Sequence, residues 1–370
     1  MLGFGEDRDR ALALLRMREA LGLRAAGGPS AAARALELLD EVIELRRKLP
    51  LPSDRFDLAA AWLNRGEILL ELGCPRDARE AIDKAINLLR DSAPGVPPHR
   101  LHRRRAIAHH NRGLTLLREG GREHARMAAA CFEEAIARLD RALFPAGEPP
   151  RGGSGTPEPE TPDDAIMAGC SWANLAEARL AAGSPACEAE AAARRALALV
   201  QDSEWTEPRA AEAALTARHV LCRILIRAGE SDAGGAVDLP SEVEELVAAG
   251  IRSGRHWRSR FADLRREFFR IAVRIHEARG PQALATFILE ETDPGNGGLP
   301  VDRTVHGAAL DALWRCARRN QATDWKALRG AQEHLLAALE PLRRVEARLL
   351  DLRQNEGGAS EHGLPPAPRG

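Results

Sequence analysis

The stretch that decides the fold is residues 59–88, AAAWLNRGEILLELGCPRDAREAIDKAINL. Its apolar residues recur at helical spacing in two segments, which predicts two amphipathic helices. Gly73 is placed to end the first helix, and Pro75 suits the first turn of the second. Small residues at Gly66 and Ala78 allow the two helices to approach closely. The stretch therefore predicts a helical hairpin.

The same offsets recur twice further along the chain. The repeated positions are Asn64/Gly66/Gly73, Asn111/Gly113/Gly120 and Asn174/Ala176/Gly183, followed by Ala78/Ala85, Ala128/Ala135 and Ala189/Ala196. Trp62 and Trp172 each stand two residues before their asparagine, and His109 takes that place in the middle copy. Repetition at fixed offsets indicates a stack of similar units rather than a single globular core.

This pattern resembles the tetratricopeptide repeat family, whose unit reads roughly W-x-N-x-G in the first helix, followed by G, A and A at these offsets. The match is close at 59–88, and it extends to 106–139 and 169–199 with a few extra residues. The resemblance implies an all-α fold, a right-handed α-solenoid of about seven stacked helical hairpins. It also implies that the first helix of each hairpin lines a concave groove.

Composition favours the same fold class. Hydrophobic residues make up 44% of the chain and are mostly Ala and Leu, while aromatic residues make up only 4%. Ala, Leu, Arg and Glu favour helix, and few runs of Val, Ile or Thr could build strands. The 53 Lys and Arg residues nearly cancel the 54 Asp and Glu residues, so global charge predicts neither nucleic acid nor a membrane as partner.

The spacing divides the chain into four regions. They are a degenerate hairpin at 1–50, three tetratricopeptide-like repeats at 51–200 with a Pro/Gly-rich loop at 145–164, divergent hairpins with a long terminal helix at 201–354, and a disordered tail at 355–370. Within the third region we expect helices at 207–229 (ended by Gly229), 241–250, 255–279, 281–291, 302–320 and 324–353. Repeat spacing resumes directly after the loop, so we expect the loop to lengthen one connection without splitting the stack.

The asparagine row is the leading candidate for a binding site. A side-chain amide both donates and accepts hydrogen bonds, so it can pair with the backbone of an extended peptide whatever its side chains. Each such bond contributes about 0.5–1.5 kcal/mol, so several in series are needed. The predicted groove residues are Leu63, Asn64, Glu67, His110, Asn111, Leu114, Asn174 and Glu177. The alternative is that asparagine is simply the common family residue at this position.

One known variant of the family groove is not expected. Chaperone-binding members clamp a C-terminal carboxylate with lysines one turn before the asparagines. Those places hold Ala60, Ile107 and Cys170 here.

Two arginine-rich segments offer an alternative anionic surface. The first is the predicted helix 255–279, with Arg255, Arg258, Arg265, Arg266 and Arg270, which could contact nucleic acid or an anionic partner. Asp263 and Glu267 offset part of this charge, so an exposed helix face with intrahelical ion pairs is the simpler explanation. The second is HRLHRRR at 99–105, which could meet an acidic segment or a phosphate, or could be a solvated helix start. Self-association through the long terminal helix is a further possibility.

The sequence offers no support for catalysis. It contains no HExxH, no GxSxG, no phosphate loop and no dinucleotide fingerprint. The six cysteines are scattered without a CxxC pair, so we expect no metal site, no cofactor and no disulfide framework. The N-terminus lacks an apolar signal core, and no apolar run is long enough to span a membrane. We therefore expect a cytoplasmic, non-enzymatic scaffold that binds a peptide or helix of another protein.

Overall fold

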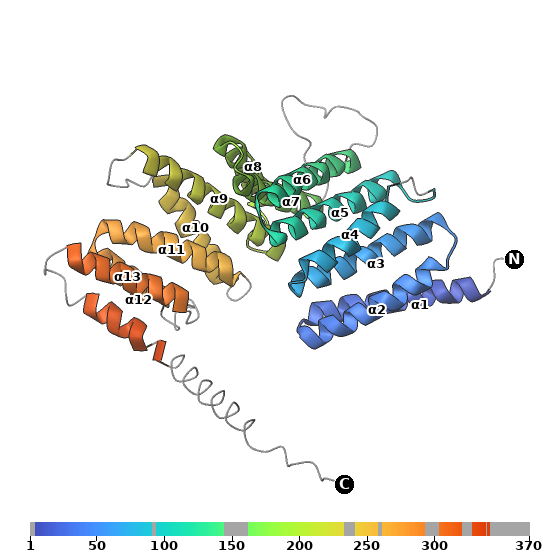
Figure 1. The fold of residues 1–370 in the computed structure, drawn as a ribbon, viewed down its shortest axis with the longest axis horizontal. Helices are drawn as coiled ribbons and strands as arrows, with labels where there is room; N and C mark the ends of the chain where they lie inside the picture. Colours follow the sequence, from blue (N-terminus) through green and yellow to red (C-terminus); the bar gives the residue numbers. More distant parts are fainter. Residues whose placement is uncertain are drawn as a thin grey trace, which may run out of the picture. The chain divides into compact units, whose positions relative to one another are not determined.

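The computed structural model describes residues 4–90, 94–143, 162–232, 241–257, 261–292, 303–319, 328–337 and 339–340. These ranges are helical with short turns and contain no β-strand, which confirms the all-α prediction (Figure 1). The chain separates into two compact units, unit 1 (Met1–Ile224) and unit 2 (Leu225–Gly370). The boundary falls inside one helix, and each unit is described by itself.

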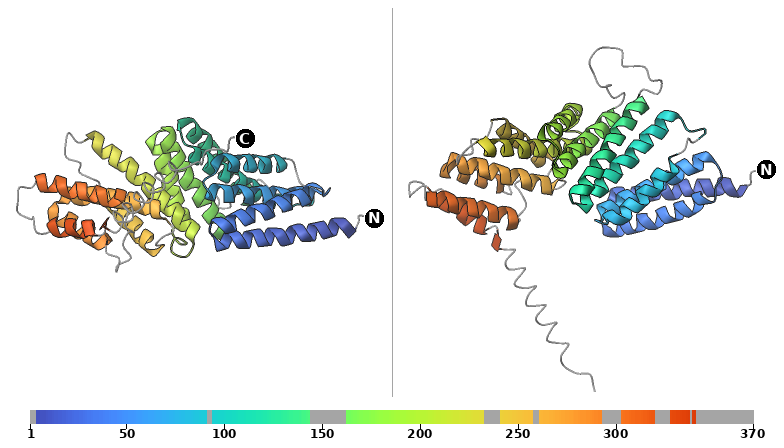
Figure 2. Two further views of the ribbon diagram at one scale, coloured as in Figure 1. Left: turned by 60° about the horizontal axis from the view of Figure 1, so that its bottom comes forward. Right: turned by 45° about the horizontal axis from the view of Figure 1, so that its top comes forward.

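Unit 1 is a stack of helical hairpins. Its helices are α1 (Phe4–Ala26), α2 (Pro29–Arg47), α3 (Pro52–Glu71), α4 (Pro75–Leu88), α5 (Pro98–Glu119), α6 (Arg122–Leu143), α7 (Pro162–Ala182) and α8 (Ala186–Val200), and α9 (Pro208–Asp232) crosses the boundary. Consecutive helices pair as antiparallel hairpins, from α1/α2 to α7/α8, and each hairpin packs on the next (Figure 2). Among the first helices, α3 also contacts α5, and α5 contacts α7. The predicted stacking of hairpins is confirmed for this unit.

Proline and glycine set the ends of these helices. Pro29, Pro52, Pro75 and Pro98 each occupy the first position of a helix, where the missing N–H is not needed. The three glycines expected to end first helices have positive φ angles: Gly73 at 76°, Gly120 at 75° and Gly183 at 73°. A left-handed conformation at this position is typical of a helix C-terminus and favours glycine.

The repeated small residues lie where the two helices of a hairpin meet. A Cβ atom at Gly66 would lie 2.6 Å from Ile82 Cγ1, and one at Gly113 would lie 2.6 Å from Phe132 Cζ. Ile82 and Phe132 are fully buried, so neither can move far. In the third copy Ala176 takes the glycine position and is also fully buried. The repeated offsets therefore encode close helix contact.

This contact can be tested with Gly113→Ala. We expect the free energy of unfolding to fall by about 1–2 kcal/mol, because overpacking against Phe132 outweighs the higher helix propensity of alanine. The matched control is Gly22→Ala, since Gly22 is helical with nothing within 4 Å of its Cβ position. That variant should gain about 0.5–1 kcal/mol. Chemical denaturation followed by circular dichroism measures both, and equal effects of the two substitutions would contradict the role of Gly113.

Unit 2 is organised around α11. Its helices are α10 (Ser241–His256), α11 (Ala262–Arg279), α12 (Pro281–Thr292) and α13 (Arg303–Arg319), and 328–337 is also helical. Helix α11 contacts α10, α12 and α13. A Cβ atom at Gly250 would lie 2.6 Å from Phe268 Cε1, so α10 and α11 approach as closely as the hairpins of unit 1.

Three predicted boundaries in the second half of the chain differ from the structure. The break expected between helices 241–250 and 255–279 is misplaced: α10 runs from Ser241 to His256, and α11 begins at Ala262. The two helices pack on each other, and this packing stabilises the longer α10. Gly229 does not end α9, because one glycine inside a helix costs only about 1 kcal/mol.

Other expected segments lie partly or wholly outside the described residues. The predicted loop 145–164 ends earlier than expected, since α7 begins at Pro162 and 144–161 are not described. Helices α6 and α7 pack on each other across it. The expected terminal helix 324–353 is described only at 328–337 and 339–340, and the tail 355–370 is not described.

Candidate interaction face of unit 1

Polar side chains connect the first helices of neighbouring hairpins. We call the surface formed by α1, α3, α5 and α7 the first-helix face. Asn64 Nδ2 of α3 lies 3.4 Å from Met17 Sδ of α1, and Asn111 Nδ2 of α5 donates to Glu67 Oε1 of α3 at 2.7 Å. The shared phase of the asparagines therefore directs Asn64 and Asn111 toward the preceding first helix.

Glu67 is the centre of a charged network that the sequence analysis only partly anticipated. Arg24, in the last turn of α1, forms ion pairs with Glu67 and with Glu71, the latter at 2.6 Å from Nη2 to Oε1. Asn111 completes the network and is 7% exposed. The Glu67 carboxylate thus holds α1, α3 and α5 together. Arg24 was not among the predicted residues.

His110 lies beneath the face. It is 6% exposed, its Nδ1 lies 2.9 Å from Ser171 Oγ, and its ring meets Phe132 edge-on at 5.5 Å. Ser171 Oγ already donates to Met167 O at 3.0 Å, so it accepts the hydrogen bond from His110 Nδ1–H. Burial lowers the pKa of His110 to about 4, and the nearby positive charge of Arg209 acts in the same direction. The imidazole is therefore neutral at pH 7 and links α5 to α7.

The remaining predicted residues differ in exposure. Leu63 is 3% exposed and belongs to the core, whereas Leu114, Asn174 and Glu177 are half-buried. The side-chain amide of Asn174 makes no hydrogen bond with any described part of the chain. Burial raises the pKa of Glu177, and the positive charges of Arg223 and Arg118 act in the opposite direction.

The arrangement of unit 1 combines glycine or alanine at each hairpin contact with first helices that lie side by side. The fold is tetratricopeptide-like. In each of the three copies, the small residue that recurs in the sequence (Gly66, Gly113 or Ala176) lies where the two helices of a hairpin meet. This agreement between sequence spacing and helix contacts carries the assignment of the fold.

No protein-family model matches the chain, and no curated protein matches it by sequence. The solved structures that share some likeness include the following three. A Rap protein in complex with competence and sporulation factor is 15% identical, with a TM-score of 0.46 over 90% of this chain and 76% of that one. A circular tandem repeat protein is 15% identical (TM-score 0.30; 93% and 86% covered), and the P58(IPK) TPR domain is 14% identical (TM-score 0.17; 89% of both covered). TM-scores this low add no weight to the assignment.

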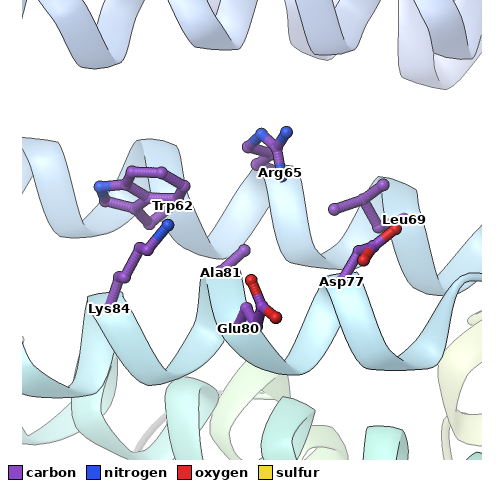
Figure 3. Close-up of a pocket in the computed structure, with 7 residues that line it drawn as sticks. All are labelled: Trp62, Arg65, Leu69, Asp77, Glu80, Ala81 and Lys84. Atoms are coloured by element: carbon purple, nitrogen blue, oxygen red, sulfur yellow. The ribbon is translucent and has the colours of Figure 1, made fainter.

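A pocket of about 200 Å³ lies on another side of α3 (Figure 3). Its lining residues are Trp62, Arg65 and Leu69 from α3, with Asp77, Glu80, Ala81 and Lys84 from α4. Two residues correspond to about 200° around a helix, so Trp62 and Asn64 point to different sides. Lys84 Nζ stands 4.4 Å from the centre of the Trp62 ring, a cation–π contact that helps fasten α4 to α3. This pocket is separate from the first-helix face.

Most arginines of the alternative surface for an anionic partner already form ion pairs within the protein. Arg255 pairs with Glu291 (Nε to Oε2, 3.3 Å), Arg266 pairs with Asp263, and Arg270 pairs with Glu267. Burial lowers the pKa of Arg265, which is 7% exposed. Arg258 lies outside the described residues. The observed pairs fit the simpler explanation of a helix surface with compensated charge.

Two kinds of feature are absent from the described ranges. No helix there has the length and apolar character that crossing a membrane requires. No group of three or more His, Cys, Asp or Glu side chains there is placed to hold a metal ion.

Proposed function

We propose that unit 1 is a protein-interaction module that binds an extended segment of another protein along the first-helix face. The observation that carries this proposal is the unused hydrogen-bonding capacity of two half-buried amides on first helices. Asn174 has no hydrogen bond within the described residues, and Asn64 has only a weak contact with a sulfur atom. Half-buried polar groups without good partners favour a ligand that supplies them.

The burial pattern narrows the predicted set of contact residues. Leu63, His110 and Asn111 are buried and serve the packing of the helices beneath the face. Asn64, Glu67, Leu114, Asn174 and Glu177 reach the surface and are the residues we expect to meet the partner. Hydrogen bonds from the Asn64 and Asn174 amides to the main chain of the partner would provide affinity, and Leu114 would favour an apolar side chain of the partner. We propose no catalytic role, and the cytoplasmic location stays a prediction.

The test uses a peptide selected by display on the full chain, with its Kd measured by calorimetry. Asn64→Ala combined with Asn174→Ala should weaken binding roughly 5- to 100-fold, because two hydrogen bonds contribute about 1–3 kcal/mol together. Helicity should not change.

The matched control is Asn87→Ala, because Asn87 lies on the second helix α4 and is exposed. Its Oδ1 accepts a hydrogen bond from Arg90 at 2.9 Å, away from the first-helix face. Binding should survive this change. A double variant that binds as tightly as the wild type, or a control that loses as much affinity, would rule out the amide-based recognition.

A further inference from the structure

The arginines of the HRLHRRR segment have different environments at the start of α5. Arg103 pairs with Asp164 (Nε to Oδ1, 3.0 Å) and with Asp163 at 3.6 Å. Arg105 donates to the carbonyl oxygens of Leu89 and Arg90 at 2.6 and 2.8 Å, which caps the end of α4. Both side chains therefore already have partners within the protein and contribute to its packing. Arg100 and Arg104 do not share these contacts.

Arg100 and Arg104 lie over the same aromatic ring. Their Cζ atoms stand 5.8 and 4.2 Å from the centre of the Phe56 ring, which is 4% exposed. Neither guanidinium forms an ion pair within the part of the chain that the structure describes. Arg104 Nη1 is enclosed and has no hydrogen-bond partner there. Two like charges thus stand side by side, one of them half-buried, and neither is paired with an acidic side chain of the described residues.

The surroundings offer these two arginines little negative charge. Residues 92–118 include six arginines and no Asp or Glu. Asp57 is the acidic group that acts on the pKa of Arg104. Its Oδ2 lies 3.2 Å from Arg46 Nη2, so Asp57 already has a partner. Burial lowers the pKa of Arg104, the negative charge of Asp57 opposes that shift in part, and the positive charge of Arg100 acts in the same direction as burial. An uncompensated charge of this kind costs free energy that a bound anion would recover.

We propose that Arg100 and Arg104 bind a phosphoryl group at the surface beside Phe56. A guanidinium stacked on a ring keeps N–H groups at its edge for a ligand, and these match the oxygens of a phosphate. For Arg104 these are the N–H groups other than the enclosed Nη1. A phosphate monoester carries a charge of about −1.5 to −2 at pH 7, so it balances both arginines, whereas a carboxylate balances one. The group could belong to a free phosphorylated metabolite or to a phosphorylated side chain. The site is distinct from the first-helix face.

Thermal unfolding of the full chain at constant ionic strength provides the test. The probes are inorganic phosphate, the peptide Gly-phosphoserine-Gly and, as the carboxylate control, Gly-Glu-Gly. We expect Tm to rise with either phosphate probe and not with Gly-Glu-Gly. A larger rise with the phosphopeptide than with inorganic phosphate would indicate a protein source, and an equal or smaller rise would indicate a metabolite. Equal rises with Gly-Glu-Gly and the phosphopeptide, or no rise with any probe, would overturn the proposal.

Two matched variants connect the effect to these residues. Arg104→Gln should abolish the phosphate-dependent rise while leaving Tm without phosphate unchanged or higher, because it removes an unpaired charge. Arg103→Gln removes a neighbouring arginine that is already paired, and it should keep the rise. Arg100 is exposed, so Arg100→Gln carries the same test if Arg104→Gln does not fold. A phosphate response that survives in both Arg104→Gln and Arg100→Gln would contradict the assignment.

Discussion

Replacing Arg218 with methionine should lower the free energy of unfolding of unit 1 by about 3–5 kcal/mol. Arg218 of α9 forms two parallel hydrogen bonds with Glu204, one of them 2.6 Å from Nη2 to Oε2. Glu204 lies between α8 and α9 and is 2% exposed. Removing the guanidinium leaves a buried carboxylate without its main countercharge, and it frees the 201–207 turn from α9. Urea denaturation followed by circular dichroism measures the loss.

Two comparisons separate this pair from ordinary surface pairs. Arg194→Met removes a partner of Glu190 from an exposed i,i+4 pair and should cost less than about 1 kcal/mol. The double change Arg218→Met with Glu204→Met should recover most of the loss, because replacing both members of a buried pair is often close to neutral. If Arg218→Met and Arg194→Met had the same effect, the buried pair would have no special role.

Acidification from pH 6.5 to about pH 4 should reduce stability by about 3 kcal/mol through His110 alone. Burial lowers the pKa of His110 to about 4, from an ordinary value of 6.5. Between those two pH values the unfolded chain binds a proton that the folded chain does not. The stabilising contribution is therefore complete above pH 6.5 and is lost progressively as the pH falls toward 4. Denaturation curves at pH 7.0 and 4.5 measure the difference.

His110→Asn removes the titrating group and keeps a donor for Ser171. This variant should show a much smaller loss of stability between pH 7.0 and 4.5 than the wild type. His99→Asn is the control, because His99 is exposed, and it should behave as the wild type does. Asp54 loses its charge only below this pH range. Burial alone would raise the pKa of Asp54, but the interactions with Arg10, Arg46 and Leu51 N–H hold that pKa below 3.8. Equal acid sensitivity of His110→Asn and the wild type would show that His110 is not the responsible group.

The sequence predicted helix pairing better than it predicted the candidate face. Offsets such as Asn64 to Gly66 and Gly73 report local geometry, because a helix places each small residue at a fixed angle toward its partner. By contrast, Arg24 reaches Glu67 from 43 residues away, and His110 reaches Ser171 from 61 residues away. Such contacts between helices leave no periodic signal. For the same reason, the sequence could not show that the amide of Asn111 is bonded to Glu67 whereas the amide of Asn174 has no hydrogen bond within the described residues.

The position of the break between α10 and α11, which we expected at 251–254, shows a second limit. Residues 257–261 read WRSRF and contain neither glycine nor proline, so no local signal separates the helices. Apolar residues continue at spacings of three and four through 255–279, which favours one helix over the whole stretch. The close approach of Gly250 to Phe268 requires the chain to reverse, and that requirement is visible only when both helices are placed. Tertiary packing therefore overrides the local pattern here.

The packing of each hairpin of unit 1 chiefly against its immediate neighbours has a mechanical consequence. Under tension applied at the two ends of this unit, the interfaces between hairpins lie in series, so each bears the same force and the weakest yields first. Hairpins would detach one after another, giving a series of small extension steps instead of one abrupt rupture.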